Sequence, residues 1–182
     1  VVWANVHAGM MLGPVLVGLF LAGECVQAAC APRLRWLARD TLGWRELGWI
    51  AGLFVLVVAS SLVNPNFFDL LRYTLLIAGD PMFTRTIGEW QPPAHFPLGS
   101  ADFLPVFWVS LVAAAASFLP TRRRFEAGHF LLFAATAYAG VKAVRNVALF
   151  GLIALPLVAF NVQAALDARP AGDARTRRRR IG

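Results

Sequence analysis

Five long stretches of mainly apolar residues constrain this chain more than any other feature of its sequence. They cover residues 7–31, 47–63, 103–119, 127–141 and 146–162. A helix that crosses a membrane needs about 20 mainly apolar residues, and shorter helices are tolerated where their ends snorkel. Hydrophobic residues form 58% of the chain and charged residues 15%, at a mean hydropathy of +0.61, which exceeds what the core of a 182-residue soluble domain can enclose. The sequence therefore predicts an all-α integral membrane protein with about five transmembrane helices, forming a bundle over residues 1–163.

The last two apolar stretches are separated by Lys142 and Arg145. A charged side chain at the centre of a bilayer costs about 2.5–3.5 kcal/mol, so a single long helix with both charges at its middle is disfavoured. We expect two helices joined by a tight turn, with the two charges at one membrane surface.

The distribution of basic residues predicts the orientation of the chain. Cytoplasmic loops of membrane proteins carry an excess of Lys and Arg. All but four of the 17 basic residues fall on one side of the predicted membrane, namely Arg33, Arg35, Arg39, Arg45, Arg122, Arg123, Arg124, Arg169, Arg175, Arg177, Arg178, Arg179 and Arg180. We therefore expect the N-terminus outside and the C-terminus in the cytoplasm. The net charge of +7 reflects this topology and does not indicate a nucleic-acid partner.

Two further features concern the ends of the chain and its cofactors. Residues 164–182 have no apolar periodicity and predict a basic, disordered cytoplasmic tail near anionic lipids. The chain begins Val-Val and not with Met, so we expect a piece of a longer protein.

Cys25 and Cys30 lack the partners of a disulfide scaffold or a zinc site, and no metal-ligand or phosphate-loop motif is present, so no cofactor is expected.

Residues 64–102 form the predicted outer loop, which is too long and too rich in aromatic residues for a simple connector. Residues 66–79 suit a short helix lying in the headgroup layer. Asp80 and Pro81 predict an N-cap and a first helical residue, opening a second helix that reaches Glu89 and Trp90. The sequence Gln-Pro-Pro at 91–93 ends that helix.

The predicted topology brings several polar or amphipathic side chains to the outer face. We expect them to bind a substrate there: Asn5, His7, Asn64, Glu89, Trp90, Gln91, Arg145 and Asn146. Each also has a structural explanation. Trp90, like Trp3, can be an interfacial aromatic, the asparagines can end or cap helices, His7 can be a satisfied interfacial histidine, and Arg145 can reach lipid phosphates.

Glu89 has two candidate partners. Arg85 lies four positions earlier on the predicted helix, which would give a local surface pair. Arg145 would instead bring a guanidinium from the distant turn, and this group can bind a phosphate bidentately. An anionic lipid headgroup or a lipid-linked phosphosugar would suit such a site. Glu24, deeper in the first stretch, is expected to be paired within the bundle.

Four short motifs resemble a known family. They are Trp-Ala-Asn-Val-His-Ala-Gly at 3–9, Leu-Val-Asn-Pro at 62–65, Ile-Gly-Glu-Trp-Gln-Pro-Pro at 87–93 and Val-Arg-Asn-Val-Ala-Leu-Phe at 144–150. The chain resembles large polytopic bacterial membrane proteins related to GT-C glycosyltransferases, of the dolichyl-phosphate-mannose mannosyltransferase-like or RgtA/B/C/D-like kind. The resemblance covers the chain up to about Phe160.

The resemblance implies an enzyme of the bacterial inner membrane that transfers a sugar from a polyprenyl-phosphate carrier at the periplasmic face. The main catalytic acid of such enzymes lies in a first outer loop that this chain lacks. Glu89 and His7 are then candidate catalytic groups only, and the segment supplies carrier and acceptor binding. Its implied partners are membrane lipid, the lipid-linked sugar donor and the missing N-terminal part of the same protein.

Two other functions stay open. One is a non-catalytic membrane module, a transporter half or scaffold, that recognises a lipid or a partner at its outer face. Transporters favour charged or broken-helix sites at the midplane and internal repeats, which this sequence does not show. The other is a fragment without independent activity.

Overall fold

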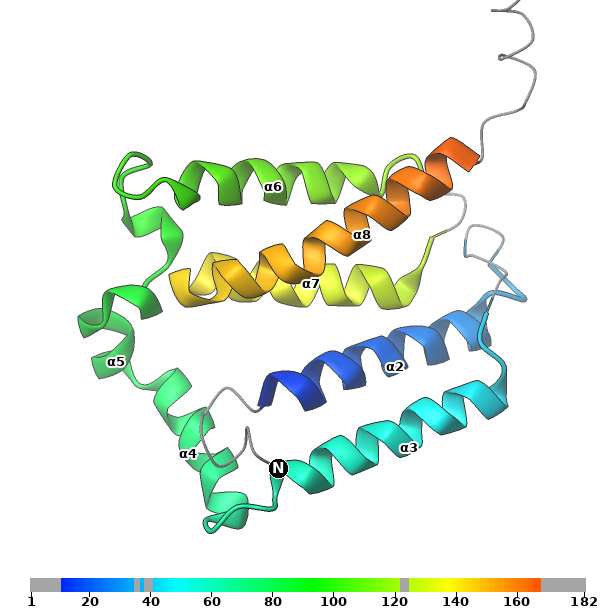
Figure 1. Cartoon of the computed structure of the whole chain (residues 1–182), viewed down its shortest axis with the longest axis horizontal. Helices are drawn as coiled ribbons and strands as arrows, with labels where there is room; N and C mark the ends of the chain where they lie inside the picture. Colours follow the sequence, from blue (N-terminus) through cyan, green and yellow to red (C-terminus); the bar gives the residue numbers. More distant parts are fainter. Residues whose placement is uncertain (1–10, 35–36, 38–40, 122–124, 168–182) are drawn as a thin grey trace, which may run out of the picture.

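A computed structural model describes residues 11–34, 37, 41–121 and 125–167. All regular structure within these residues is helical, apart from an isolated β-bridge between Leu37 and Phe125, so the prediction of an all-helical fold is confirmed for them. Each of the five apolar stretches overlaps one of the longer helices, which run side by side (Figure 1): α2 (Leu12–Cys30), α3 (Trp44–Ser61), α6 (Phe103–Ser117), α7 (Ala127–Lys142) and α8 (Val147–Asp167).

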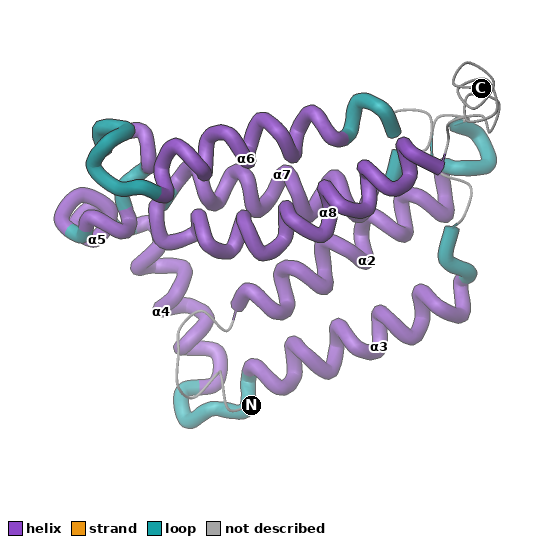
Figure 2. The backbone as a smooth tube through the Cα atoms, turned by 45° about the horizontal axis from the view of Figure 1, so that its top comes forward, coloured by secondary structure: helices purple, strands orange, loops and turns teal. Residues whose placement is uncertain are grey.

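The five helices pack in the order α3, α2, α7, α8, α6, each against the next (Figures 1 and 2). Three helical segments are long and apolar enough to cross a membrane: α2, α3 and Val144–Asp167, which includes the 3-10 turn η4 (Val144–Asn146) before α8. Helix α6 is apolar but has 15 residues, and α7 has 16. By length and hydropathy, three of the five predicted spans are therefore candidate membrane-spanning helices.

Two short helices lie across one end of this bundle (Figure 1): α4 (Phe67–Gly79) and α5 (Pro81–Thr86). Helix α4 exposes apolar Phe67, Phe68 and Leu75, together with the charged residues Asp69 and Arg72. A helix with both kinds of surface, set crosswise at a bundle end, suits the boundary between headgroups and acyl chains. The helix occupies the stretch where the sequence predicts an interfacial one.

Helices α2 and α7 approach each other closely because two glycines meet. A Cβ on Gly23 would lie 2.3 Å from the Cα atom of Gly128, and a Cβ on Gly128 would lie 2.9 Å from Oε1 of Glu24. Glu24 is buried in this interface and makes no ion pair with any described residue. The small residues therefore allow contact between the two backbones, as in many membrane helix pairs.

Gln27 joins the same two helices by hydrogen bonds. Its side chain is fully buried; Nε2 donates to the carbonyl oxygen of Phe125 at 3.0 Å, and Oε1 accepts from the backbone N–H of Ala127 at 3.0 Å. Ala127 opens α7, where backbone N–H groups lack partners within the helix. The buried amide therefore caps α7 from α2.

Helices α6, α7 and α8 share an apolar core of Phe107, Ala114, Ala137, Phe150 and Ala154. The rings of Phe107 and Phe150 meet edge to face with centroids 5.5 Å apart, an arrangement that aromatic quadrupoles favour. This core fixes the beginning of α8 and therefore the turn that connects it to α7.

Two helix boundaries differ most from the sequence prediction. The helix predicted to run from Pro81 to Trp90 stops at Thr86, because Ile87 is extended, with φ −99° and ψ 113°. Helix α8 continues to Asp167, into the stretch predicted as disordered tail. Ala164 and Ala165 favour helix, and Gln163 donates to Asp167 Oδ1 at 2.9 Å one turn later. Residues 168–182 of the predicted tail lie outside the described residues.

Candidate functional site

Local sequence sets the path of the chain from α4 to the candidate site. Asp80 caps α5, accepting a hydrogen bond from the Met82 N–H at 2.8 Å, and Pro81 takes the first helical position. After the extended Ile87, the chain forms two 3-10 turns, η2 (Gly88–Trp90) and η3 (Pro93–His95). These turns bring residues 88–96 against the η4 turn and α7.

The break at Ile87 decides the partner of Glu89. On a continuous helix Arg85 would face Glu89, but the helix ends between them. Arg145 instead lies with Nη1 4.0 Å from Oε1 of Glu89. In the structure Glu89 is therefore paired with Arg145, the candidate partner that is distant in sequence, and not with Arg85.

Arg145 also lies over the indole ring of Trp90. Its Cζ atom is 4.4 Å from the ring centroid, well within the range of a cation–π interaction. The Arg145 side chain is 33% exposed and that of Glu89 is 61% exposed, so solvent or a ligand can reach both charges. This contact restrains the guanidinium, whose N–H groups can also donate hydrogen bonds to an anion.

Gln91 adds a further contact between residues 88–96 and the η4 turn. Its backbone oxygen accepts from the Val144 N–H at 3.0 Å, and its side-chain Nε2 donates to the carbonyl oxygen of Arg85 at 2.9 Å. We call these contacting residues the loop–turn junction: Glu89, Trp90, Gln91, Val144 and Arg145. The junction brings together four of the eight residues expected at the site, Gln91 through its backbone.

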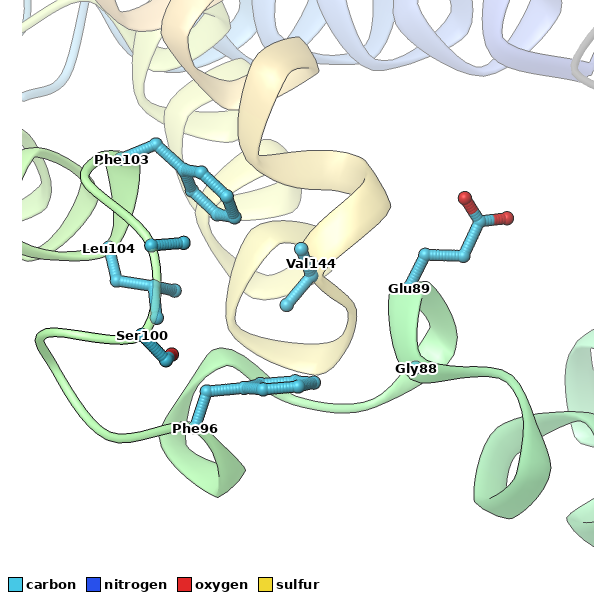
Figure 3. A pocket seen from close by; sticks show the side chains of 8 residues that line it. Gly88, Glu89, Phe96, Ser100, Phe103, Leu104 and Val144 are labelled. Atoms are coloured by element: carbon cyan, nitrogen blue, oxygen red, sulfur yellow. The ribbon is translucent and has the colours of Figure 1, made fainter.

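A pocket of about 300 Å³ lies beside the junction. Its apolar walls are Phe96, Ala101, Phe103, Leu104 and Val144. Figure 3 shows the rings of Phe96 and Phe103 directed toward Val144, with Gly88 and Glu89 on the other side of Val144 from Leu104. The sequence prediction missed these walls, because the residues read individually as loop or span residues and become a pocket only when residues 88–104 fold against η4.

Asn64 and Asn146 lie at helix ends, where their side chains make local hydrogen bonds. Asn64 is buried between α3 and α4; Nδ2 donates to the carbonyl oxygen of Ser61 at 2.9 Å, and Oδ1 accepts from the Asn66 N–H at 2.8 Å. The turn is tight enough to place Phe67 at φ 40°, a conformation that costs a bulky residue energy. Asn146 Nδ2 donates to the carbonyl oxygen of Ala139 at 3.0 Å, at the end of α7.

Asn5 and His7, with Trp3, lie outside the described residues. Their place relative to the loop–turn junction therefore stays a prediction. Among the described residues, no group of three or more His, Cys, Asp or Glu side chains is arranged to hold a metal ion.

The fold and site define an all-helical protein with helices of membrane-spanning length and an accessible Arg–Trp–Glu cluster at one end of the bundle. Comparisons with family models, with curated proteins and with solved structures gave no match.

Proposed function

We propose that this chain is a segment of a membrane glycosyltransferase that uses a polyprenyl-phosphate sugar at the periplasmic face of the bacterial inner membrane. In this proposal all five long helices span the membrane, the N-terminus is outside, and the C-terminus is cytoplasmic. Residues 64–102 and 142–146 form the outer surface. The observation that supports it most is the position of Arg145, stacked on Trp90 and accessible beside Glu89.

Arg145 is the proposed phosphate ligand. A guanidinium offers paired N–H groups that match phosphate oxygens, and the cation–π contact with Trp90 restrains its position. The Glu89 pair, at 4.0 Å and largely exposed, is weak enough for a phosphate to replace it. A departing carrier phosphate would then have its charge balanced by Arg145.

The remaining predicted residues have supporting roles in the proposal. Gln91 and Asn146 hold the loop and the turn in place through backbone contacts. Glu89 and His7 stay candidate catalytic groups, and the main catalytic acid would come from another part of the protein. The membrane lipid around α4 and the lipid-linked donor are the proposed partners.

The loop–turn junction also supports a second function. Three contacts tie residues 89–91 to Val144 and Arg145, and such contacts would serve equally in a non-catalytic membrane module that needs only a fixed outer surface. A transporter half or scaffold that recognises a lipid or partner would use the same residues without chemistry.

Capture of a photoreactive polyprenyl phosphate by the chain in lipid nanodiscs tests the phosphate site. We expect Arg145→Ala to lower capture at least about tenfold, the loss of a charged hydrogen-bonding group. Arg85→Ala is the matched control, since Arg85 is also exposed on the 64–102 segment and is not stacked. Equal capture by both variants would reduce Arg145 to a structural contact. Transfer of sugar by the complete protein, lost in Arg145→Ala and Glu89→Gln with membrane insertion unchanged, separates the enzyme from the non-catalytic module.

The topology has its own test. A reporter fused after Arg124 should report the cytoplasm, and one fused near Pro93 should report the periplasm. The opposite pattern would place the loop–turn junction on the wrong side for a periplasmic enzyme.

A further inference from the structure

The corner between α3 and α4 holds a bulky residue in a conformation that such residues disfavour. Phe67 has φ 40°, in the left-handed region that glycine and asparagine enter most easily. The buried Asn64 side chain fixes the turn: it donates to the carbonyl oxygen of Phe67 at 3.5 Å. It also bonds the Ser61 carbonyl oxygen and the Asn66 N–H. Phenylalanine at this position therefore costs backbone energy, which contacts of its ring have to offset.

The described chain does not supply those contacts. Phe67 is 64% exposed, and the neighbouring Phe68 is 68% exposed. Figures 1 and 2 both show the α3–α4 corner at an extremity of the described chain. Whatever favours two phenylalanines at this corner therefore lies outside the described residues.

Helix α4 also needs an external support. Among the described helices it packs chiefly against α5 and only sparsely against the long helices. A helix of 13 residues is marginal in water unless an apolar face is packed against something. Leu75 and Leu76 of α4 are nevertheless exposed. The support of α4 and the contacts of the corner thus call for the same apolar surroundings.

The surroundings of the corner indicate a bilayer. Helix α3, which leads into it, has membrane-spanning length and exposes Val55 and Leu56. Asp69 and Arg72, which follow the corner, are exposed and charged. The chain therefore passes from a surface that suits acyl chains to one that suits headgroups at Phe67 and Phe68. A protein partner fits less well, because a protruding tip of two side chains cannot supply the roughly 800 Å² that each partner buries in a stable interface.

We propose that the α3–α4 corner is a membrane anchor: Phe67 and Phe68 enter the acyl layer of the adjacent leaflet and hold α4 in the headgroup region. The occupant of this surface is lipid. The anchor rests on the membrane setting of the proposed function and not on its sugar chemistry. It assigns to the strained turn the role of directing two aromatic rings out of the fold.

Photocrosslinking identifies what surrounds the corner. The full chain carries p-benzoylphenylalanine in place of Phe67, Phe68 or Leu98 and is reconstituted in phosphatidylcholine vesicles. Leu98 is the matched control, since it is 61% exposed on the same outer segment but follows η3. We expect acyl-chain adducts at positions 67 and 68, found by mass spectrometry, and far fewer at position 98. Equal lipid adducts at all three positions, or cross-links from the corner to a second copy of the chain, would overturn the anchor.

Substitutions at the corner separate an anchor from a residue that serves the fold. Phe67→Asn suits the positive φ but removes the apolar ring, whereas Phe67→Leu keeps an apolar side chain. Relief of strain alone would slow amide hydrogen exchange in α4. Loss of the anchor should instead speed it, and for the full chain in nanodiscs we expect about fivefold faster exchange in Phe67→Asn, net of the strain relieved. Phe67→Leu should stay close to wild type. Exchange in Phe67→Asn that is equal to or slower than in wild type would overturn the proposal.

Phe68→Asn provides the same test without a change in strain, because φ is positive at Phe67 and not at Phe68. We expect about tenfold faster exchange in α4. Arg145→Ala should retain the acyl adducts at positions 67 and 68, since its described partners are Glu89 and Trp90. A chain that captures the polyprenyl phosphate but gives no acyl adduct at either position would overturn the anchor and leave the phosphate site standing.

Discussion

The α2–α7 interface and the loop–turn junction each hold distant parts of the chain together, but by different forces. In the first, two glycine backbones touch and the buried Gln27 amide makes two hydrogen bonds to backbone. In the second, an exposed ion pair at 4.0 Å and a stacked guanidinium make the main contacts. Contacts of the first kind have no substitute in the apolar surroundings, whereas those of the second kind can be exchanged for ligand contacts. The α2–α7 interface therefore fixes the fold, and the loop–turn junction is the proposed place of binding.

The largest effect on the free energy of unfolding is expected where Gly23 meets Gly128. Gly23→Ala places a Cβ 2.3 Å from a backbone atom of α7, so the two helices must move apart. Overpacking typically costs about 1–3 kcal/mol, and we expect about 3 kcal/mol or more here because no flexible side chain can give way. Thermal unfolding in detergent micelles measures this loss of stability. Gly52→Ala is the control, since nothing lies within 4 Å of its Cβ. Equal stability of the two variants would contradict the close α2–α7 packing.

The next largest effect on stability is expected at the buried amide of Gln27. Gln27→Leu leaves the Ala127 N–H and a Phe125 carbonyl contact without their side-chain partner, and we expect a loss of about 2 kcal/mol in the free energy of unfolding. Gln163→Leu, on the exposed face of α8, should change stability little. The same unfolding assay compares them, and a small effect in both would show that Gln27 does not cap α7.

Substitutions at the corner between α3 and α4 are expected to affect stability less than those at the α2–α7 interface and more than those at the loop–turn junction. Asn64→Ala removes hydrogen bonds to Ser61 and Asn66 and should cost about 1 kcal/mol, as for a lost helix cap. Asn66→Ala keeps the backbone N–H that Asn64 binds, so its effect should be smaller. If the Asn64 variant also loses carrier capture in nanodiscs, its side chain has a binding role beyond the corner.

The smallest effect on stability is expected at the ion pair. Glu89→Gln should change the free energy of unfolding by less than about 0.5 kcal/mol, because exposed pairs contribute little. The measurement sharpens the comparison when carrier capture by the same variant is followed in parallel. A cost as large as that of Gln27→Leu would mean that the loop–turn junction is a structural element of the fold.

Hydropathy and charge are enough to predict a helix in every apolar stretch, and Asp80 with Pro81 predicts the start of α5. The break at Ile87 escapes prediction because a helix end at an extended β-branched residue depends on what the following residues contact. For the same reason the sequence offers Arg85 and Arg145 as partners of Glu89 without choosing between them. The pocket cannot be predicted, since its walls come from segments that meet only in the folded chain.

The role of Gln27 also has no signal in the sequence. A single amide in an apolar helix has no periodic pattern, and its partners at Phe125 and Ala127 are about 100 positions away. The predicted partner for Glu24 illustrates the reverse case: the burial of Glu24 is expected, but a backbone glycine, not a cation, lies beside its carboxylate among the described residues.

The hydrogen bond from Val144 to Gln91 also has a consequence for the order in which the protein is assembled. Synthesis proceeds from the N-terminus, so residues 88–96 leave the ribosome well before the turn that they contact. They remain without their final partners until α7 and the beginning of α8 have been made. The candidate site is thus completed last, and the fluorescence of Trp90 should report when the final hairpin arrives.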